Sequence, residues 1–176
     1  MKKYKFVFSL IFAVVAIVLT GALVHYYDKS KGVVYSVAQI DSKANMPYLG
    51  NIVEQTQANT DFRKVLFTGT RSQLVIMSIP PGGEVGDEVH IYTEQTLFFL
   101  SGTGKAILDG KTSPIGPGDV VVVVPGTEHN FINTGTVPLK IYTVYAPPNH
   151  IDGTIEATKA EADANVQDEA YGNQPK

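Results

Sequence analysis

Residues Gly83–Gly102 of the sequence read GEVGDEVHIYTEQTLFFLSG, in which a dense group of polar side chains stands directly before an apolar run. Glu88 and His90 are two positions apart, so on a strand both side chains point to the same face of the sheet. Gln95 follows after four intervening residues, next to Glu94. The polar group fits three interpretations: a metal site, an acid–base pair, or a solvated loop.

The segments on either side of this stretch predict an all-β domain. Short apolar or alternating runs rich in Val, Ile, Phe, Tyr and Thr recur between Gly, Pro, Asn and Asp residues, as is typical of strands. Asp109-Gly110 is the dipeptide of a tight hairpin turn. The run Val120–Val124 is interpreted as a buried strand. Beyond the N-terminal segment one helix is predicted, over Gly153–Asn165 with Thr154 as its N-cap, so the pattern favours a sandwich or small barrel with a short C-terminal helix.

A second polar group lies in Gly118–Asn133, which reads GDVVVVVPGTEHNFIN. Gly126 predicts a turn after the apolar run, and His129 follows after two intervening residues. The two stretches together resemble the two signature motifs of the cupin superfamily, in their order and spacing. The resemblance covers roughly residues 60–147 and implies a single cupin (double-stranded β-helix, or jelly-roll) barrel. The surrounding sequence is similar to small single-domain bacterial cupins, some of them loosely labelled mannose-6-phosphate isomerase-like.

The resemblance also implies a set of metal ligands. The usual three histidines and one glutamate of the family fall on Glu88, His90, Gln95 and His129 of this sequence. Glu replaces the first histidine and Gln replaces the glutamate, so the set still contains one carboxylate. The gap after Gly83 is four residues, one fewer than the usual five. Two imidazoles, a carboxylate and an amide oxygen suit one divalent ion, which by ligand type can be Zn, Fe, Mn or Ni.

Several polar residues near these motifs have open roles. Adjacent strand residues face opposite ways, so either Gln95 or Glu94 enters the barrel, and the spacing to the following glycine favours Gln95. Glu94 and Glu128 are the candidate catalytic proton carriers. His150, in the run PPNHIDG, is interpreted as a loop residue.

The beginning of the chain predicts a membrane segment. A short basic start is followed by Phe6–Val24, 19 residues without a charge, which is long enough to cross a membrane as a helix. We therefore expect an N-terminal transmembrane helix, within a signal anchor or signal peptide over residues 1–27, with the remaining chain outside the cytoplasmic membrane. A tether over 28–47, the barrel over 48–151, and a surface helix with a loose tail over 152–176 complete the predicted organisation.

Composition narrows the classes of function. The net charge is −3 and no broad basic patch lies outside the N-terminus, which argues against a nucleic-acid partner. The absence of cysteine excludes disulfides, thiolate zinc sites and cysteine nucleophiles. The sequence thus predicts a membrane-anchored, metal-binding cupin that acts on a small molecule, as an oxygenase or a sugar isomerase or epimerase. The alternative is a non-catalytic module that binds a sugar or another small molecule, and a homodimer through strand edges is expected in either case.

Overall fold

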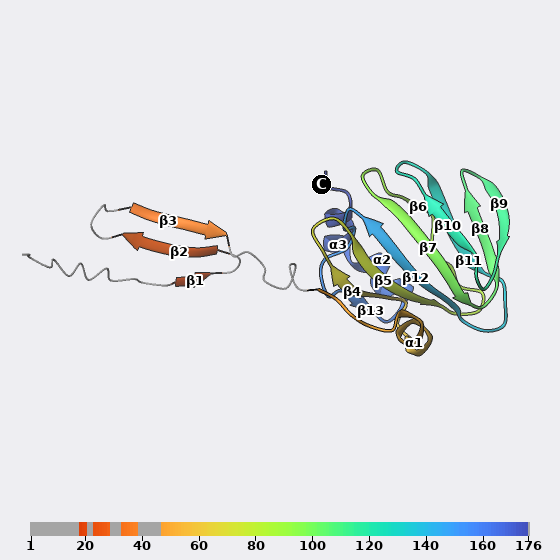
Figure 1. Cartoon of the computed structure of the whole chain (residues 1–176). Helices are drawn as coiled ribbons and strands as arrows, with labels where there is room; N and C mark the ends of the chain where they lie inside the picture. Colours follow the sequence, from red (N-terminus) through yellow and green to blue (C-terminus); the bar gives the residue numbers. More distant parts are fainter. Residues whose placement is uncertain (1–17, 21–22, 29–32, 39–46, 176) are drawn as a thin grey trace, which may run out of the picture. The chain divides into compact units, whose positions relative to one another are not determined.

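The computed structural model describes residues 18–20, 23–28, 33–38 and 47–175, which belong to two compact units (Figure 1). The N-terminal unit contains an antiparallel sheet of three strands in the order β1-β2-β3. The strands are β1 (Val18–Thr20), β2 (Leu23–Asp28) and β3 (Val33–Ala38). They are rich in Val, Leu and Tyr, which suit the pleated backbone of a strand.

The transmembrane helix predicted over Phe6–Val24 is wrong. The described part of that segment lies in β1 and β2, and no helix among the described residues is long and apolar enough to cross a membrane. The prediction rested on apolar length, a property that Val- and Leu-rich strands share with helices. In β2 the backbone pairs with the neighbouring β3 instead of along a helix. The predicted membrane localisation and membrane partner are withdrawn with the helix, and residues 6–17 lie outside the described part of the chain.

The C-terminal unit consists of two antiparallel sheets that enclose an apolar core (Figure 1). The larger sheet has the strand order β10-β7-β12-β5-β4-β13, and the smaller has the order β6-β11-β8-β9. The predicted all-β sandwich or barrel is therefore confirmed. The strands are β4 (Arg63–Thr68), β5 (Gln73–Ile79), β6 (Glu88–Val89), β7 (Glu94–Ser101), β8 (Gly104–Leu108), β9 (Lys111–Ile115), β10 (Val120–Val123), β11 (Glu128–Asn133), β12 (Leu139–Ala146) and β13 (Ile155–Glu156).

Alternating residues of β7 fill the space between the sheets. Leu97 and Phe99 are buried, and the Phe99 ring lies 5.6 Å from that of Phe131 on β11, which joins the two sheets. Gln95 has the same inward direction and is 2% exposed, whereas its neighbour Glu94 is exposed. The alternation of strand side chains therefore brings Gln95, and not Glu94, into the barrel.

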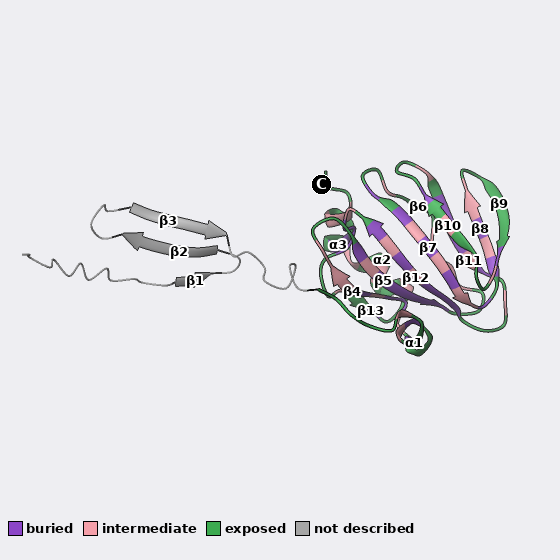
Figure 2. Ribbon diagram, in the orientation of Figure 1, coloured by how far each residue is buried: buried purple, intermediate pink, exposed green. Residues whose placement is uncertain are grey.

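Strand β10 differs from its prediction as a buried strand. Val120, Val122 and Val124 are 54%, 52% and 53% exposed, and Figure 2 shows exposed residues along this strand. The reason is topological: β10 lies at the edge of its sheet, pairs only with β7, and turns one face to solvent. The hairpin at Asp109-Gly110 is confirmed, since both residues have positive φ (46° and 74°) between β8 and β9.

Over residues 47–175, three short helices accompany the sheets: α1 (Ile52–Ala58), α2 (Lys159–Ala164) and α3 (Val166–Gly172). The sequence did not predict α1, which packs against β5, β7 and β12. The helix predicted from Thr154 instead begins at Lys159, where Thr158 is the N-cap, because Ile155–Glu156 pairs with β4 as β13. Strand β13 thereby fixes the start of α2 beside the edge of the larger sheet.

Candidate metal centre

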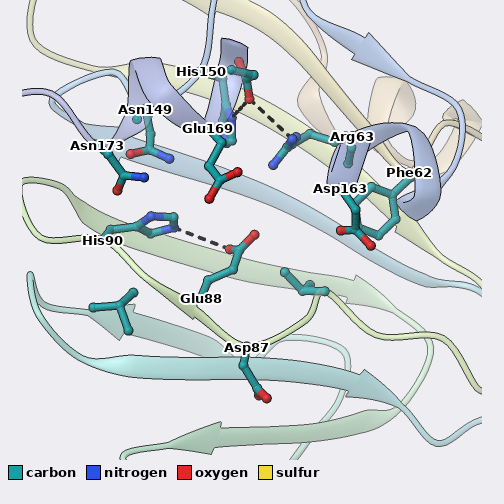
Figure 3. A pocket seen from close by; sticks show the side chains of 15 residues that line it. Phe62, Arg63, Asp87, Glu88, His90, Asn149, His150, Asp163, Glu169 and Asn173 are labelled. Atoms are coloured by element: carbon teal, nitrogen blue, oxygen red, sulfur yellow. Dashed lines mark hydrogen bonds and ion pairs between the residues drawn. The ribbon is translucent and has the colours of Figure 1, made fainter. Parts of the chain in front are cut away.

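Strand pairing brings the two sequence motifs together. β6 pairs with β11 so that His129 lies opposite Glu88. His90 follows β6 directly, and its carbonyl oxygen accepts a hydrogen bond from the Gly126 amide at 2.9 Å, which ties it to the turn before β11. The Glu88 Oε2 atom lies 3.5 Å from His90 Nε2 and 3.8 Å from His129 Nε2, and Figure 3 shows the His90 ring directed at Glu88. One potential ligand atom from each of the three residues lies within 4.8 Å of the others.

The ring nitrogens at this cluster are arranged as metal ligands usually are. His129 is 1% exposed, and its Nδ1 lies 2.9 Å from the Thr127 carbonyl oxygen. Nδ1 therefore carries the proton and donates it, which leaves the lone pair on Nε2. The Nε2 atoms of His90 and His129 are buried and have no hydrogen-bond partner. Buried polar atoms are rarely left unpaired, and a divalent ion bound by the two Nε2 lone pairs would be the missing partner of both atoms.

Gln95 is oriented by Tyr145. The Gln95 Nε2 atom donates a hydrogen bond to the Tyr145 hydroxyl at 2.8 Å, and its Oε1 is buried without a partner. The Tyr145 ring in turn lies 5.7 Å from the His90 ring. Burial raises the pKa of Tyr145, so its hydroxyl stays protonated. The free oxygen of the amide is the atom that suits a metal, as the sequence motif implied.

The ionisation states at the cluster also suit a metal. Burial raises the pKa of Glu88, but the adjacent His90 ring, whose Nε2 lies 3.5 Å from the carboxylate, together with Arg63 and His129, outweighs burial and holds this pKa below its ordinary value. Burial lowers the pKa of His129, against the opposing hydrogen bond to the Thr127 carbonyl. An anionic carboxylate and a neutral imidazole are the forms that coordinate a divalent ion.

A cavity of about 330 Å³ adjoins the cluster (Figure 3). Glu88 and His90 form part of its wall together with Val85, Asp87 and Val89 of the same segment. The remaining wall comes from the start of β4, the loop after β12, and helices α2 and α3 with the residue that follows them. The volume is within the range of sites for small molecules, which starts at about 300 Å³. Glu94 and Glu128 are exposed and do not line this cavity. Their role as proton carriers remains a prediction that their placement does not favour.

The structure adds two residues that the motifs did not indicate. His150, interpreted from the sequence as a loop residue, is 3% exposed and lines the cavity. Its Nδ1 lies 2.6 Å from Asp168 Oδ2 on α3. No sequence pattern joins two residues at this separation. The only signal was the position of His150 in the loop that follows β12, the last long strand of the barrel.

The two-sheet fold and the histidine-carboxylate cluster define a cupin-type protein. The family model described as Cupin domain matches residues 75–145, and the chain belongs to this family, as the sequence resemblance implied. The YrkC protein of Bacillus subtilis (strain 168), which is described as uncharacterized, is 40% identical over 123 residues, a match that covers 66% of each chain.

One solved structure and one curated protein extend the comparison. The crystal structure of BH2720 from Bacillus halodurans has a TM-score of 0.67 and 36% identity, and the match covers 68% of this chain and 96% of that chain. The oxalate-binding protein of Thermotoga maritima is 35% identical over 68 residues, which are 39% of this chain and 56% of that protein. The similarity to the BH2720 structure supports the fold.

Proposed function

We propose that this protein binds one divalent metal ion through Glu88, His90, Gln95 and His129, and acts on a small molecule in the adjoining cavity. One observation carries the proposal: the buried, unpartnered Nε2 atoms of His90 and His129 both lie beside the Glu88 carboxylate. The ligand set suits Zn, Fe, Mn or Ni. A bound ion would polarise a carbonyl or hydroxyl group of the small molecule, or activate oxygen if it is iron.

The residues of the chain would hold and orient the reactants. The hydrogen bond from Gln95 to Tyr145 would fix the amide oxygen toward the ion, and the Thr127 carbonyl would fix the His129 ring. The reaction would be of the oxygenase type or of the sugar isomerase or epimerase type. A non-catalytic binding module is the second candidate. It is favoured by the exposure of Glu94 and Glu128, which leaves both predicted proton carriers away from the cavity.

Elemental analysis of the purified full chain tests the metal site. The wild type, produced with metals supplied, should contain about one divalent ion per chain, and His90→Ala and His129→Ala should each lose it. Glu94→Gln is the matched control, because Glu94 neighbours Gln95 but is exposed, and it should retain the ion. A metal-free wild type, or equal metal in all four proteins, would contradict the proposal.

Turnover separates the two candidate functions. The metal-loaded chain is incubated with neutral monosaccharides under oxygen, and NMR follows the sugar composition while an electrode follows oxygen consumption. A change in either quantity that disappears in His129→Ala supports an enzyme. A metal-loaded protein that binds a sugar without changing it supports the binding module.

A further inference from the structure

The backbone of His150 is held in place by the side chain of Gln73. Gln73, the first residue of β5, is buried and accepts hydrogen bonds at its Oε1 from the amides of Asn149 (3.1 Å) and His150 (2.9 Å). Its Nε2 donates to the His150 carbonyl oxygen at 2.7 Å. One glutamine side chain therefore satisfies three backbone groups of the loop after β12, so that the His150 side chain starts from a fixed position.

Asp168 then fixes the ring of His150. Its Oδ1 accepts a hydrogen bond from the Ile151 amide at 2.7 Å, and its Oδ2 lies 2.6 Å from His150 Nδ1 and 3.4 Å from Arg63 Nη2. Burial raises the pKa of Asp168, but the hydrogen bond from His150 and the other contacts outweigh it and hold the pKa below its ordinary value. The ionised carboxylate can only accept, so the His150 Nδ1 atom carries the hydrogen.

The second ring nitrogen of His150, Nε2, is a hydrogen-bond acceptor to which no donor is bonded. Burial lowers the pKa of His150, so the ring is neutral near pH 7 and its Nε2 has a free lone pair. This atom is buried, has no hydrogen-bond partner, and belongs to a residue that lines the cavity. His150 is not one of the residues whose ligand atoms cluster within 4.8 Å at the candidate metal centre. A hydrogen-bond donor is therefore the partner that this nitrogen lacks.

The charge of the cavity wall indicates which donors fit. Five carboxylates line it, namely Asp87, Glu88, Asp163, Asp168 and Glu169, and the one Lys or Arg side chain among the described lining residues is Arg63. Arg63 is already bonded, through Nε to Glu156 at 2.7 Å and through Nη2 to Asp168. Even with a divalent ion bound, negative charges outnumber positive ones along the wall. A phosphate or dicarboxylate would be repelled there.

We propose that the cavity binds a neutral, hydroxyl-bearing small molecule, and that His150 accepts a hydrogen bond from one of its hydroxyl groups. Asp168 is the positioning residue that keeps the acceptor lone pair on His150 Nε2. The inference rests on the proposed function, because the metal ion would hold another part of the same molecule. It assigns a substrate class to the cavity and favours neutral sugars and polyols over sugar phosphates and oxalate.

Binding to the metal-loaded full chain tests this assignment with five probes. The neutral probes are glycerol, D-xylose and D-glucose, and the anionic probes are glucose 6-phosphate and oxalate. Long-range ¹H–¹⁵N spectra of the histidine rings report contact with His150. A neutral sugar should shift the His150 Nε2 resonance, and His150→Phe, which keeps a planar ring, should weaken sugar binding about tenfold. Binding of the anions alone, or of none of the five probes, would overturn the proposal.

Asp168→Asn tests the positioning role separately. The amide oxygen should stay toward the Ile151 amide, so the NH₂ group should face His150 Nδ1 and donate to it. The ring hydrogen then moves to Nε2, the acceptor becomes a donor, and sugar binding weakens. The ¹⁵N shifts report this change of tautomer, which a merely structural role of Asp168 would not produce. Glu54→Gln, an exposed carboxylate-to-amide change on α1, is the control and should leave the tautomer unchanged.

Metal content measured on the same samples separates the two levels of inference. A chain that binds no metal contradicts the proposed function. A chain that binds metal and then prefers oxalate or glucose 6-phosphate contradicts only the assignment of a neutral ligand. Circular dichroism of His150→Phe and Asp168→Asn establishes folding, and the wild-type probe panel decides the proposal if either variant is unfolded.

Discussion

His129 and His150 are constructed alike from different parts of the molecule. Each ring is buried, has its Nδ1 fixed by an oxygen, and leaves its Nε2 without a partner. For His129 the oxygen is the Thr127 carbonyl two residues earlier, at the start of a barrel strand. For His150 it is the Asp168 carboxylate on a helix 18 residues later. The orientation of the His129 ring depends on the local backbone. The orientation of the His150 ring depends on the contacts that hold α3 against the barrel.

The largest expected effect is a loss of stability when the ion pairs of Arg63, which hold α3 near His150, are broken. Arg63→Met removes the buried partner of Glu156 and Asp168, and we expect a loss of about 3–5 kcal/mol in the free energy of unfolding. Denaturant titration measures the loss, and hydrogen exchange should show faster exchange in α3 than in β11. Equal changes in both elements would contradict the view that Arg63 holds the helix that orients His150.

The chain provides a matched control for this variant. Lys159 and Asp163 form an ion pair at 2.7 Å on α2, but their side chains are 35% and 59% exposed. Lys159→Met should therefore cost roughly 0.5 kcal/mol or less, because solvent already screens the pair. A cost as large as that of Arg63→Met would show that the hydrophobic replacement, and not the lost charge pair, causes the destabilisation.

The next largest effect concerns metal affinity at the candidate metal centre, to which His129 belongs. Gln95→Leu replaces the amide by an apolar side chain of similar size and so removes the unpartnered Oε1, and we expect metal affinity to fall about tenfold. Competition with a chelator measures this change. Glu94→Gln should leave the affinity unchanged, since Glu94 is exposed on the opposite face of β7. The reverse result would assign the ligand role to Glu94.

Acidification should destabilise the metal-free protein by a smaller amount. Burial lowers the pKa of both His129 and His150, so each binds a proton less readily in the folded than in the unfolded state. Their contribution to stability is fully present above the unfolded pKa of about 6.5 and is lost as the pH falls toward the lower folded values. The melting temperature should drop by a few degrees between about pH 7.5 and about pH 5.5 at constant ionic strength. A rise over this range would contradict the neutral, buried state of both rings.

The smallest expected effect distinguishes the two histidines most directly. His150→Ala should change metal affinity less than about threefold, because His150 stands outside the cluster of ligand atoms. Chelator competition compares it with His129→Ala, for which the affinity should be lost. If both variants lose the metal equally, His150 is a metal ligand. The proposed assignment of His150 to the binding of a small molecule in the cavity is then incorrect.

Much of the barrel could be predicted from the sequence because strand periodicity and turn chemistry are local. The Asp109-Gly110 hairpin follows from two residues that tolerate positive φ, and the strands on either side follow from their apolar alternation. The transmembrane helix predicted over Phe6–Val24 was wrong because apolar length alone does not separate a helix from strands such as those that the described residues of this segment form. Val120–Val124 was misread because only the strand order shows that β10 lies at a sheet edge.

By itself the sequence determined the family and the residues that form the candidate metal centre, since the spacing of Glu88, His90 and His129 is fixed within short motifs. The motif spacing favoured Gln95 over Glu94 as the inward residue, and the burial of Gln95 in the tertiary structure decided it. Tertiary structure alone decided that His150 meets Asp168. The physical reason is the range of the interactions. A motif records contacts between near neighbours, whereas the cavity wall arises where β13 and the Arg63 ion pairs bring the C-terminal helices back to the barrel.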